Sequence, residues 1–255
     1  MQHTEEIVLQ VRQKILACAD TLSVSQSLSF FKDGEAPQKI HGVKKTADVN
    51  RIAKDSFKEI KNRPKNDVFD CCEALFASGY MEEMTVACKW AEMLHKQYEP
   101  VDFCIFERWL DNYVDNWATC DNLCPHAIGT FVMKFPEYVS HLKIWAKSTN
   151  RWMRRGAAVT LIIPARKGLF LDDILEIAEI LLLDKDDLVQ KGYGWMLKAA
   201  SMSEIFVKGT DEQKKEHLNA VFDFVMKHKA IMPRTALRYA IEKMPDELKK
   251  KAMKK

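Results

Sequence analysis

The sequence predicts an all-α protein built from repeated helix pairs. Hydrophobic residues recur three and four positions apart along most of its 255 residues, which is the spacing of one helix face. Glycine and proline are sparse, at 9 and 8 residues, and no strand or hairpin turn is convincing. With 47% hydrophobic residues the chain can bury a sizeable core, and no apolar run approaches the length of a membrane span.

The elements follow in order along the chain. An apolar stripe through Ile7, Val11 and Ile15 predicts the first helix, and the loop-like segment 32–42 (KDGEAPQKIHG) separates a short N-terminal helix pair from the rest. A later stripe runs from Leu175 to Leu182. Helix boundaries are predicted at seven turn signals: Ser78-Gly79, Glu99-Pro100, Phe135-Pro136, Ile163-Pro164, Lys208-Gly209-Thr210, Met232-Pro233 and Met244-Pro245.

Similar units return along the chain. Segments that open at Trp117, Trp152, Val189 and Pro233 start 35, 37 and 44 residues apart. Two helices in each unit of about 35 to 45 residues indicate HEAT-like repeats, whose pairs bury their apolar faces by stacking on their neighbours. The sequence thus predicts one domain, residues 1–255, that forms a superhelical solenoid with a concave groove.

Charge is segregated along the chain, although the net charge is a mild +3. Residues 127–170 contain eight basic residues and one acidic residue, and residues 227–255 contain ten and three. Residues 171–190 contain seven acidic residues and one basic residue. This distribution predicts a basic groove that attracts an anion such as nucleic acid, and a separate acidic face.

Cysteine usage and the N-terminal sequence favour a reducing compartment. Seven cysteines lie mostly in apolar helical stretches, which is typical of buried thiols, and the start MQHTEEIVLQ does not resemble a signal peptide. We expect a cytoplasmic protein. The spacing of Cys120, Cys124 and His126 is compatible with a metal site, but no second pair completes a tetrahedron, so packing and turn roles are favoured and no metal or other cofactor is expected.

Aromatic, acidic and basic residues coincide in three consecutive repeats. Trp117 and Asp121 are four residues apart and share a helix face; Arg154 with Arg155 opens the next repeat, and Trp195 lies in the one after it. Equivalent positions of a solenoid align along one surface. A helical tryptophan more often belongs to the core, and an aspartate near a helix end is more often a cap, so the combination carries the functional interpretation.

Three motifs, in order and at repeat spacing, resemble those of one family: residues 116–121 (NWATCD), 150–158 (NRWMRRGAA) and 189–197 (VQKGYGWML). The chain resembles the AlkD-type DNA alkylation repair glycosylases from His41-Gly42 to Arg234. The resemblance implies that Asp121 is the essential acid, that Trp117 and Trp195 contact the sugar, and that Arg155 is the active-site arginine. It also implies that cationic N3- and N7-alkylated purines are excised without flipping the base.

The chemistry agrees with these roles. An alkylated purine is already a cationic leaving group, so the enzyme stabilises a developing oxocarbenium ion and positions water. An aspartate of ordinary pKa, about 3.9, is ionised at neutral pH, and its negative charge would stabilise the positive charge that develops on the sugar. Two indole faces would stabilise the same positive charge. Arg155 would hold a backbone phosphate by a forked contact. The candidates for sequence-independent phosphate binding are Lys134, Lys147, Arg151, Arg154, Lys191 and Arg234.

Other interpretations stay open. Lys198 could form a Schiff base, although nothing in the sequence specifies the lowered pKa that this requires. The favoured function is that of a DNA glycosylase acting as a monomer on double-stranded DNA that contains alkylated bases, with no membrane partner. The alternatives are a DNA-binding member without excision activity and a protein-interaction scaffold.

Overall fold

The computed structural model describes residues 2–32, 36–202 and 210–254, and within these ranges the fold is all-α. No strand occurs among the described residues, where isolated bridges join Ala19 to Val43 and Lys39 to Tyr80. The predicted fold class is confirmed. The chain divides into two compact units, Met1–Ala127 and Ile128–Lys255, and the single-domain interpretation stays a prediction.

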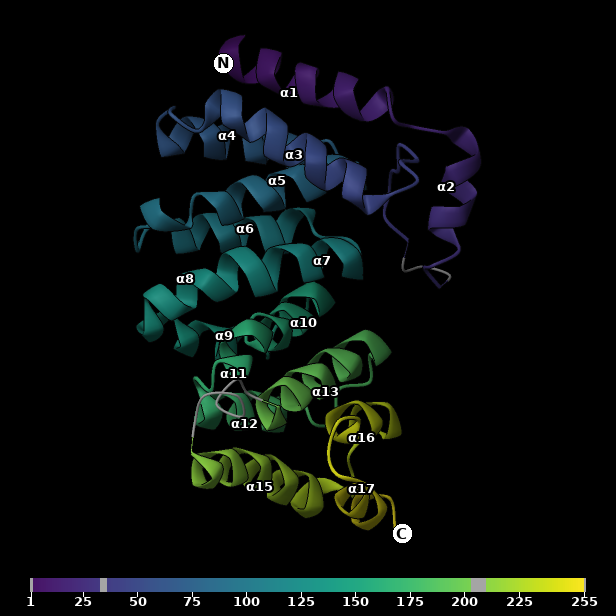
Figure 1. Ribbon diagram of the computed structural model, residues 1–255, viewed down its shortest axis with the longest axis vertical. Helices are drawn as coiled ribbons and strands as arrows, with labels where there is room; N and C mark the ends of the chain where they lie inside the picture. Colours follow the sequence, from purple (N-terminus) through teal and green to yellow (C-terminus); the bar gives the residue numbers. More distant parts are fainter. Residues whose placement is uncertain (1, 33–35, 203–209, 255) are drawn as a thin grey trace. The chain divides into compact units, whose positions relative to one another are not determined.

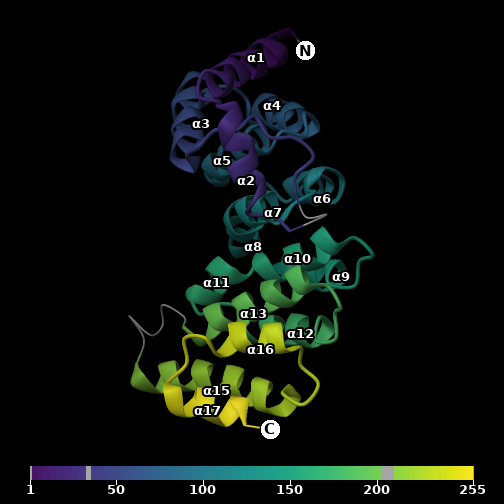
Figure 2. The same ribbon diagram turned by 90° about the vertical axis from the view of Figure 1, so that its right-hand side faces the viewer.

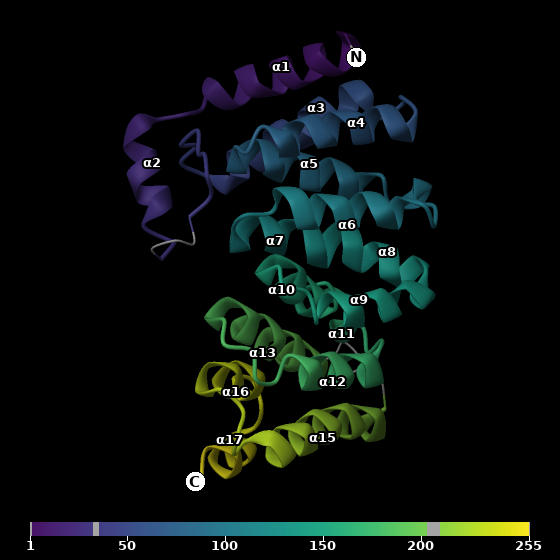
Figure 3. The ribbon, with the colours of Figure 1, turned by 180° about the vertical axis from the view of Figure 1, so that it is seen from behind.

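Most helices of the first unit pack against helices one to three places along the chain (Figures 1 and 3). The helices are α1 (Gln2–Leu16), α2 (Thr21–Leu28), α3 (Thr46–Ile60), α4 (Lys65–Ala77), α5 (Met81–Met93), α6 (Asp102–Tyr113) and α7 (Trp117–Leu123), with a 3-10 turn, η1 (His95–Gln97).

The second unit is built in the same way, and Figure 2 shows α13 lying next to α12 and α16. Its helices are α8 (Gly129–Lys134), α9 (Val139–Trp145), α10 (Arg151–Val159), α11 (Ile162–Arg166), α12 (Leu171–Ile180), α13 (Asp187–Ser201), α15 (Asp211–His228), α16 (Arg234–Ile241) and α17 (Asp246–Met253), with a 3-10 turn, η3 (Pro136–Tyr138). A π-helical turn, η2 (Cys124–Ile128), follows α7 and contains the unit boundary.

Aromatic side chains hold neighbouring helices together in the core of each unit. In the first, fully buried Trp109 of α6 contacts Phe69 and Phe76 of α4, with ring centroids 5.4 and 5.0 Å apart. In the second, buried Tyr193 of α13 donates its hydroxyl to the carbonyl of Leu182, 3.1 Å away, at the end of α12. Burial raises the pKa of Tyr193, so this hydroxyl remains a donor.

Most predicted helix boundaries are confirmed. Gly79 lies between α4 and α5, and prolines 100, 136, 233 and 245 precede or begin helical segments. The boundary at Ile163-Pro164 is confirmed to within one residue, because α10 ends at Val159 and α11 begins at Ile162, with Pro164 as its third residue. Its missing N–H has no acceptor in the first turn of a helix, so proline is tolerated there. Lys208 and Gly209 lie outside the described residues, and Thr210 lies directly before α15.

The connection between α2 and α3 is held by two buried carboxylates at the start of α5. Glu82 accepts the backbone N–H groups of His41, Gly42 and Val43 at 3.0, 2.9 and 3.1 Å. Glu83 binds Arg12 of α1 through both carboxylate oxygens, at 2.8 and 2.9 Å, and its Oε1 lies 2.8 Å from His41 Nε2. The predicted loop is therefore an ordered connection in its described part.

Close approach of α13 to α16 requires a glycine at position 194. A Cβ added there would lie 2.7 Å from Cβ of Tyr239 and 2.8 Å from the carbonyl oxygen of Ala236, which is a backbone atom. At Gly192, two residues earlier, the nearest atom to an added Cβ is 3.4 Å away, in ordinary van der Waals contact. The two glycines of the KGYG segment therefore differ in what they do.

We predict that Gly194→Ala destabilises the protein by about 1–3 kcal/mol, because α16 must shift. Gly192→Ala is the matched control. It should be neutral or stabilising by up to about 1 kcal/mol, since alanine has the higher helix propensity. Urea unfolding of both variants measures this, and equal stabilities would contradict the close approach.

The Glu83 cluster predicts a pH dependence of stability. Burial raises the pKa of Glu83, but hydrogen bonds from Arg12 and His41 outweigh this effect, and the pKa is lowered overall. The ionised form therefore adds stability that is complete above the unfolded carboxyl pKa, about 4.3, and is lost as the pH falls toward the lower native pKa.

We expect Glu83→Gln to cost about 2 kcal/mol at pH 7, with the deficit shrinking below about pH 4. The control is Glu59→Gln, which removes an exposed pair with Lys14 and should have little effect. Denaturation at several pH values checks this, and a deficit that does not change with pH would be the contrary result.

Candidate functional site

The start of α7 presents the first two predicted site residues. Fully buried Asn116 caps the helix: its Oδ1 accepts the N–H of Thr119 at 2.9 Å, and its Nδ2 donates to the Thr119 hydroxyl at 3.0 Å. Trp117 is the first helical residue and Asp121 lies one turn later, so both point from the same face. Both are partly exposed, and their role as a pair stays a prediction.

The chain that follows α2 supports this face. The ring of Phe31 lies against Trp117, with centroids 5.3 Å apart and planes tilted by 38°. The backbone N–H of Gln38 donates to Oδ2 of Asp115 at 2.8 Å, just before α7 begins. Sequence reasoning missed Phe31, because its contact depends on a loop that returns from a distant helix.

In the second unit, Arg155 packs against α13, the helix that contains Trp195. Arg155 belongs to α10, is 5% exposed, and donates from Nη1 to the carbonyl of Leu188 in the first turn of α13. Its Cγ and Nη1 pass 3.4 and 3.6 Å from the Cβ position of Gly192. Trp195 is one turn beyond Gly192, on the same face and partly exposed. The predicted convergence of this pair with Trp117 and Asp121 stays a prediction.

The predicted separation of a basic and an acidic face is wrong in the second unit. Arg154 donates from Nε to Asp184 at 2.6 Å, Arg151 binds Asp186 through two contacts at 2.8 and 2.9 Å, and Lys191 lies 2.6 Å from Asp187. The acidic segment therefore neutralises part of the basic one.

Three of the predicted phosphate ligands are thus already in ion pairs. The other three, Lys134, Lys147 and Arg234, are exposed, and Nζ of Lys134 lies 5.4 Å from the ring of Phe135. For all six, phosphate binding stays a prediction.

The cysteine and histidine cluster is dispersed among other partners. Sγ of Cys120 lies 3.9 Å from Sγ of Cys124, and both thiols are buried, whereas Nδ1 of His126 lies 3.2 Å from Oε1 of Glu92. The hydrogen bond from His126 is the largest cause of a lowered Glu92 pKa, about 2. Within the described chain, no group of three or more metal-ligating side chains occurs.

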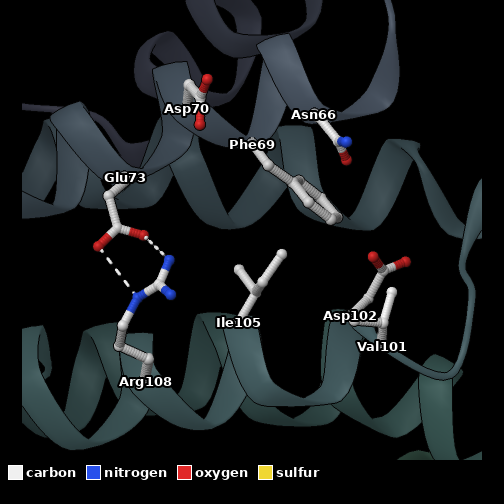
Figure 4. Close-up of a pocket in the computed structure, with 8 residues that line it drawn as sticks. All are labelled: Asn66, Phe69, Asp70, Glu73, Val101, Asp102, Ile105 and Arg108. Carbon is white, nitrogen blue, oxygen red and sulfur yellow. Dashed lines mark hydrogen bonds and ion pairs between the residues drawn. The ribbon is translucent and has the colours of Figure 1, made fainter.

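A pocket of about 330 Å³ lies between α4 and α6, away from the predicted residues (Figure 4). Two of its three carboxylates have partners. Glu73 accepts hydrogen bonds from Arg108 at 3.3 and 2.6 Å, and Asp102 pairs with Lys65 at 2.9 Å. The lining residues are Asn66, Phe69, Asp70, Glu73, Val101, Asp102, Ile105 and Arg108.

Comparison with known proteins decides the family. The model of a family described as DNA alkylation repair enzyme matches residues 11–244. The chain belongs to this DNA alkylation repair enzyme family. A solved structure titled a predicted DNA alkylation repair enzyme from Enterococcus faecalis is similar in fold, with a TM-score of 0.70 and 15% identity over 89% of this chain and 97% of that one. No curated protein matches the chain.

Family membership makes DNA the partner to test and supports a role in alkylation repair. Among the described residues, no helix is long and apolar enough to cross a bilayer. The AlkD-type motifs named from the sequence all lie inside the matched range.

The ion pairs predict different outcomes for two basic residues. Lys147→Gln should weaken DNA binding and reduce the slope of log affinity against log salt by about 0.9, as for one lost phosphate contact. Arg154→Gln should leave the slope unchanged but lower the melting temperature by about 2–4 °C, because it leaves Asp184 without its guanidinium.

Salt-dependent fluorescence anisotropy and thermal unfolding measure these two effects. The contrary result is that Arg154→Gln reduces the salt slope as much as Lys147→Gln and does not lower the melting temperature. Arg154 would then contact DNA phosphate and not pair with Asp184.

Proposed function

We propose that the protein is an alkylpurine DNA glycosylase that hydrolyses the N-glycosidic bond of cationic N3- and N7-alkylpurines in duplex DNA without flipping the base. The observation that carries the proposal is the capped start of α7, which presents Trp117 and Asp121 from one face in a member of the DNA alkylation repair enzyme family.

The reaction needs little proton transfer. The bond between C1′ and the purine nitrogen breaks with its electron pair on the purine, and the alkylated base leaves as a neutral molecule. The sugar becomes an oxocarbenium ion, to which water adds with loss of a proton, giving an abasic site. The carboxylate of Asp121 stabilises the positive sugar and orients this water.

The aromatic residues act on the same charge. Trp117 and Trp195 flank the deoxyribose and attract it as it becomes cationic, by about 0.5–2 kcal/mol for each ring. Phe31 limits the rotation of Trp117 by packing on it, so the indole is ordered before DNA binds.

Lys198 serves as a cation in this scheme. Its Nζ donates to Oε2 of Glu242 at 2.8 Å, and this bond is the largest cause of a lowered Glu242 pKa. The ion pair holds Lys198 Nζ on Glu242, whereas formation of a Schiff base requires this amine to attack the sugar carbon. This contact favours direct hydrolysis over covalent catalysis.

The burial of Arg155 favours a second candidate function. The guanidinium of Arg155 binds the carbonyl of Leu188 and stabilises the packing of α10 on α13. This structural role would be needed even in a protein that does not excise bases. The second candidate is therefore a DNA-binding family member that does not excise bases.

We predict that the wild type releases 7-methylguanine and 3-methyladenine from alkylated duplex DNA, and that Asp121→Asn slows release by about 10²-fold or more while leaving DNA affinity unchanged. Asp111→Asn is the matched control, since Asp111 is an exposed aspartate of α6 in the same unit. It should release base at the wild-type rate.

Two results would contradict the glycosylase. Equal release by Asp121→Asn and the wild type would remove Asp121 from the reaction. DNA binding with no release by the wild type would favour the second candidate. The non-flipping step has its own measure: 2-aminopurine beside the lesion should stay quenched on binding, and a rise in its fluorescence would indicate an unstacked base.

A further inference from the structure

The pocket between α4 and α6, of about 330 Å³, belongs to the first unit and contains a fixed ion pair at one end (Figure 4). Glu73 accepts two hydrogen bonds there from Arg108. Trp109 Nε1 and the Tyr113 hydroxyl donate to the same carboxylate at 2.5 and 2.7 Å. Burial raises the pKa of Glu73, but these hydrogen bonds outweigh it and the pKa is lowered overall. The charge of Glu73 is therefore compensated within the protein.

The carboxylate of Asp70 is not compensated in this way. Asp70 lies three residues before Glu73 on α4 and is exposed, and it has no hydrogen-bond or ion-pair partner among the residues that the structure describes. Asn66, one turn earlier on the same wall, offers an amide oxygen. On the α6 side, Val101 is 67% exposed and Ile105 is half-buried. The pocket thus presents a free negative charge beside exposed aliphatic surface.

Acidic residues extend beyond the pocket along both helices. Residues 65–77 contain three acidic residues and one basic residue, and residues 99–113 contain four and one. The two basic residues, Lys65 and Arg108, are both in ion pairs with carboxylates of these segments. The resulting negative potential attracts cations and repels the phosphates of DNA. This surface therefore suits a partner other than nucleic acid.

We propose that the pocket is a docking site for a lysine-rich segment of a partner protein. One lysine lays its aliphatic stem against Val101 and Ile105 and places its ammonium group beside Asp70 and Asn66. A lysine side chain supplies both features that the pocket requires, because its methylene groups cover apolar surface while its charged end stays in water. An inorganic cation would leave Val101 exposed, and an apolar side chain would leave Asp70 without a counter-charge.

The extent of the acidic surface favours a protein segment as the occupant. The pocket lies at the small end of the range for small-molecule sites and takes about one side chain, whereas the acidic residues continue along α4 and α6. A chain of successive lysines matches the pocket and its surroundings, because complementary charge steers such a segment and fixes its position. A free alkylamine would match the pocket alone. The assignment does not rest on the proposed excision of bases.

The test is fluorescence anisotropy of the full chain with a labelled lysine-rich peptide, without DNA. The matched probe is the same peptide with its lysines acetylated, which keeps the stems and removes the charge. We expect saturable binding of the first peptide, weakened by salt, and none of the second. Asp70→Asn should weaken binding by about fivefold and Val101→Ser by about threefold.

Asp67→Asn is the matched control, because Asp67 is an exposed aspartate of α4 that does not line the pocket. It makes the same charge change as Asp70→Asn and should weaken binding less than twofold. Equal affinities of these two variants would overturn the proposal, since they would show a general attraction to acidic residues and no contact at Asp70.

Two further results would overturn the proposal. The first is binding of the acetylated peptide as tightly as the unmodified one, or no binding of either. The second is displacement of the peptide by spermidine at the peptide's own concentration, which would assign the pocket to a free alkylamine. Because these measurements involve no alkylated DNA, failure of the glycosylase assay alone would leave the docking site intact.

Discussion

Stacking of each helix on the helices that follow it is the constraint on which the rest of this structure depends. A single amphipathic helix cannot cover its apolar face, so each one is positioned by neighbours about one repeat away in sequence. Side-chain bonds between helices join residues that are separated in sequence by about one repeat. Arg108 binds Glu73 at a separation of 35 residues, Arg151 binds Asp186 at 35, and Lys198 binds Glu242 at 44.

This constraint also positions the candidate site residues. The Asn116 cap fixes where α7 starts, and hence which face carries Trp117 and Asp121. In the second unit, three arginines of α10 bind at the start of α13. Arg154 and Arg151 bind Asp184 and Asp186, which lie just before α13, and Arg155 binds the carbonyl of Leu188 in its first turn. The motif arginines are therefore ordered by bonds within the protein, whereas Lys134 and Lys147 are exposed.

The sequence predicted the helical fold and most of its boundaries, because hydrophobic spacing and proline report local structure directly. The sequence wrongly predicted separate basic and acidic faces. Charge composition along the chain does not show that a basic residue lies beside an acidic residue one repeat later. The observed separation of Arg151 and Asp186 matches the 35-residue and 37-residue steps between motifs, so the repeat itself could have predicted their pairing. The contact of Phe31 with Trp117 and the pocket between α4 and α6 depend on loops and helix crossings that no sequence period specifies.

In the proposed reaction, Asp121 acts as a negative charge and not as a proton donor. The most direct measurement is the single-turnover rate of 7-methylguanine release from DNA across pH. If Asp121 acts in this way, the rate is constant from about pH 6 to 9 and falls at lower pH as a carboxylate is protonated. A rate that fell steadily as the pH rose through neutrality would contradict it, because it would require a general acid to protonate the leaving base.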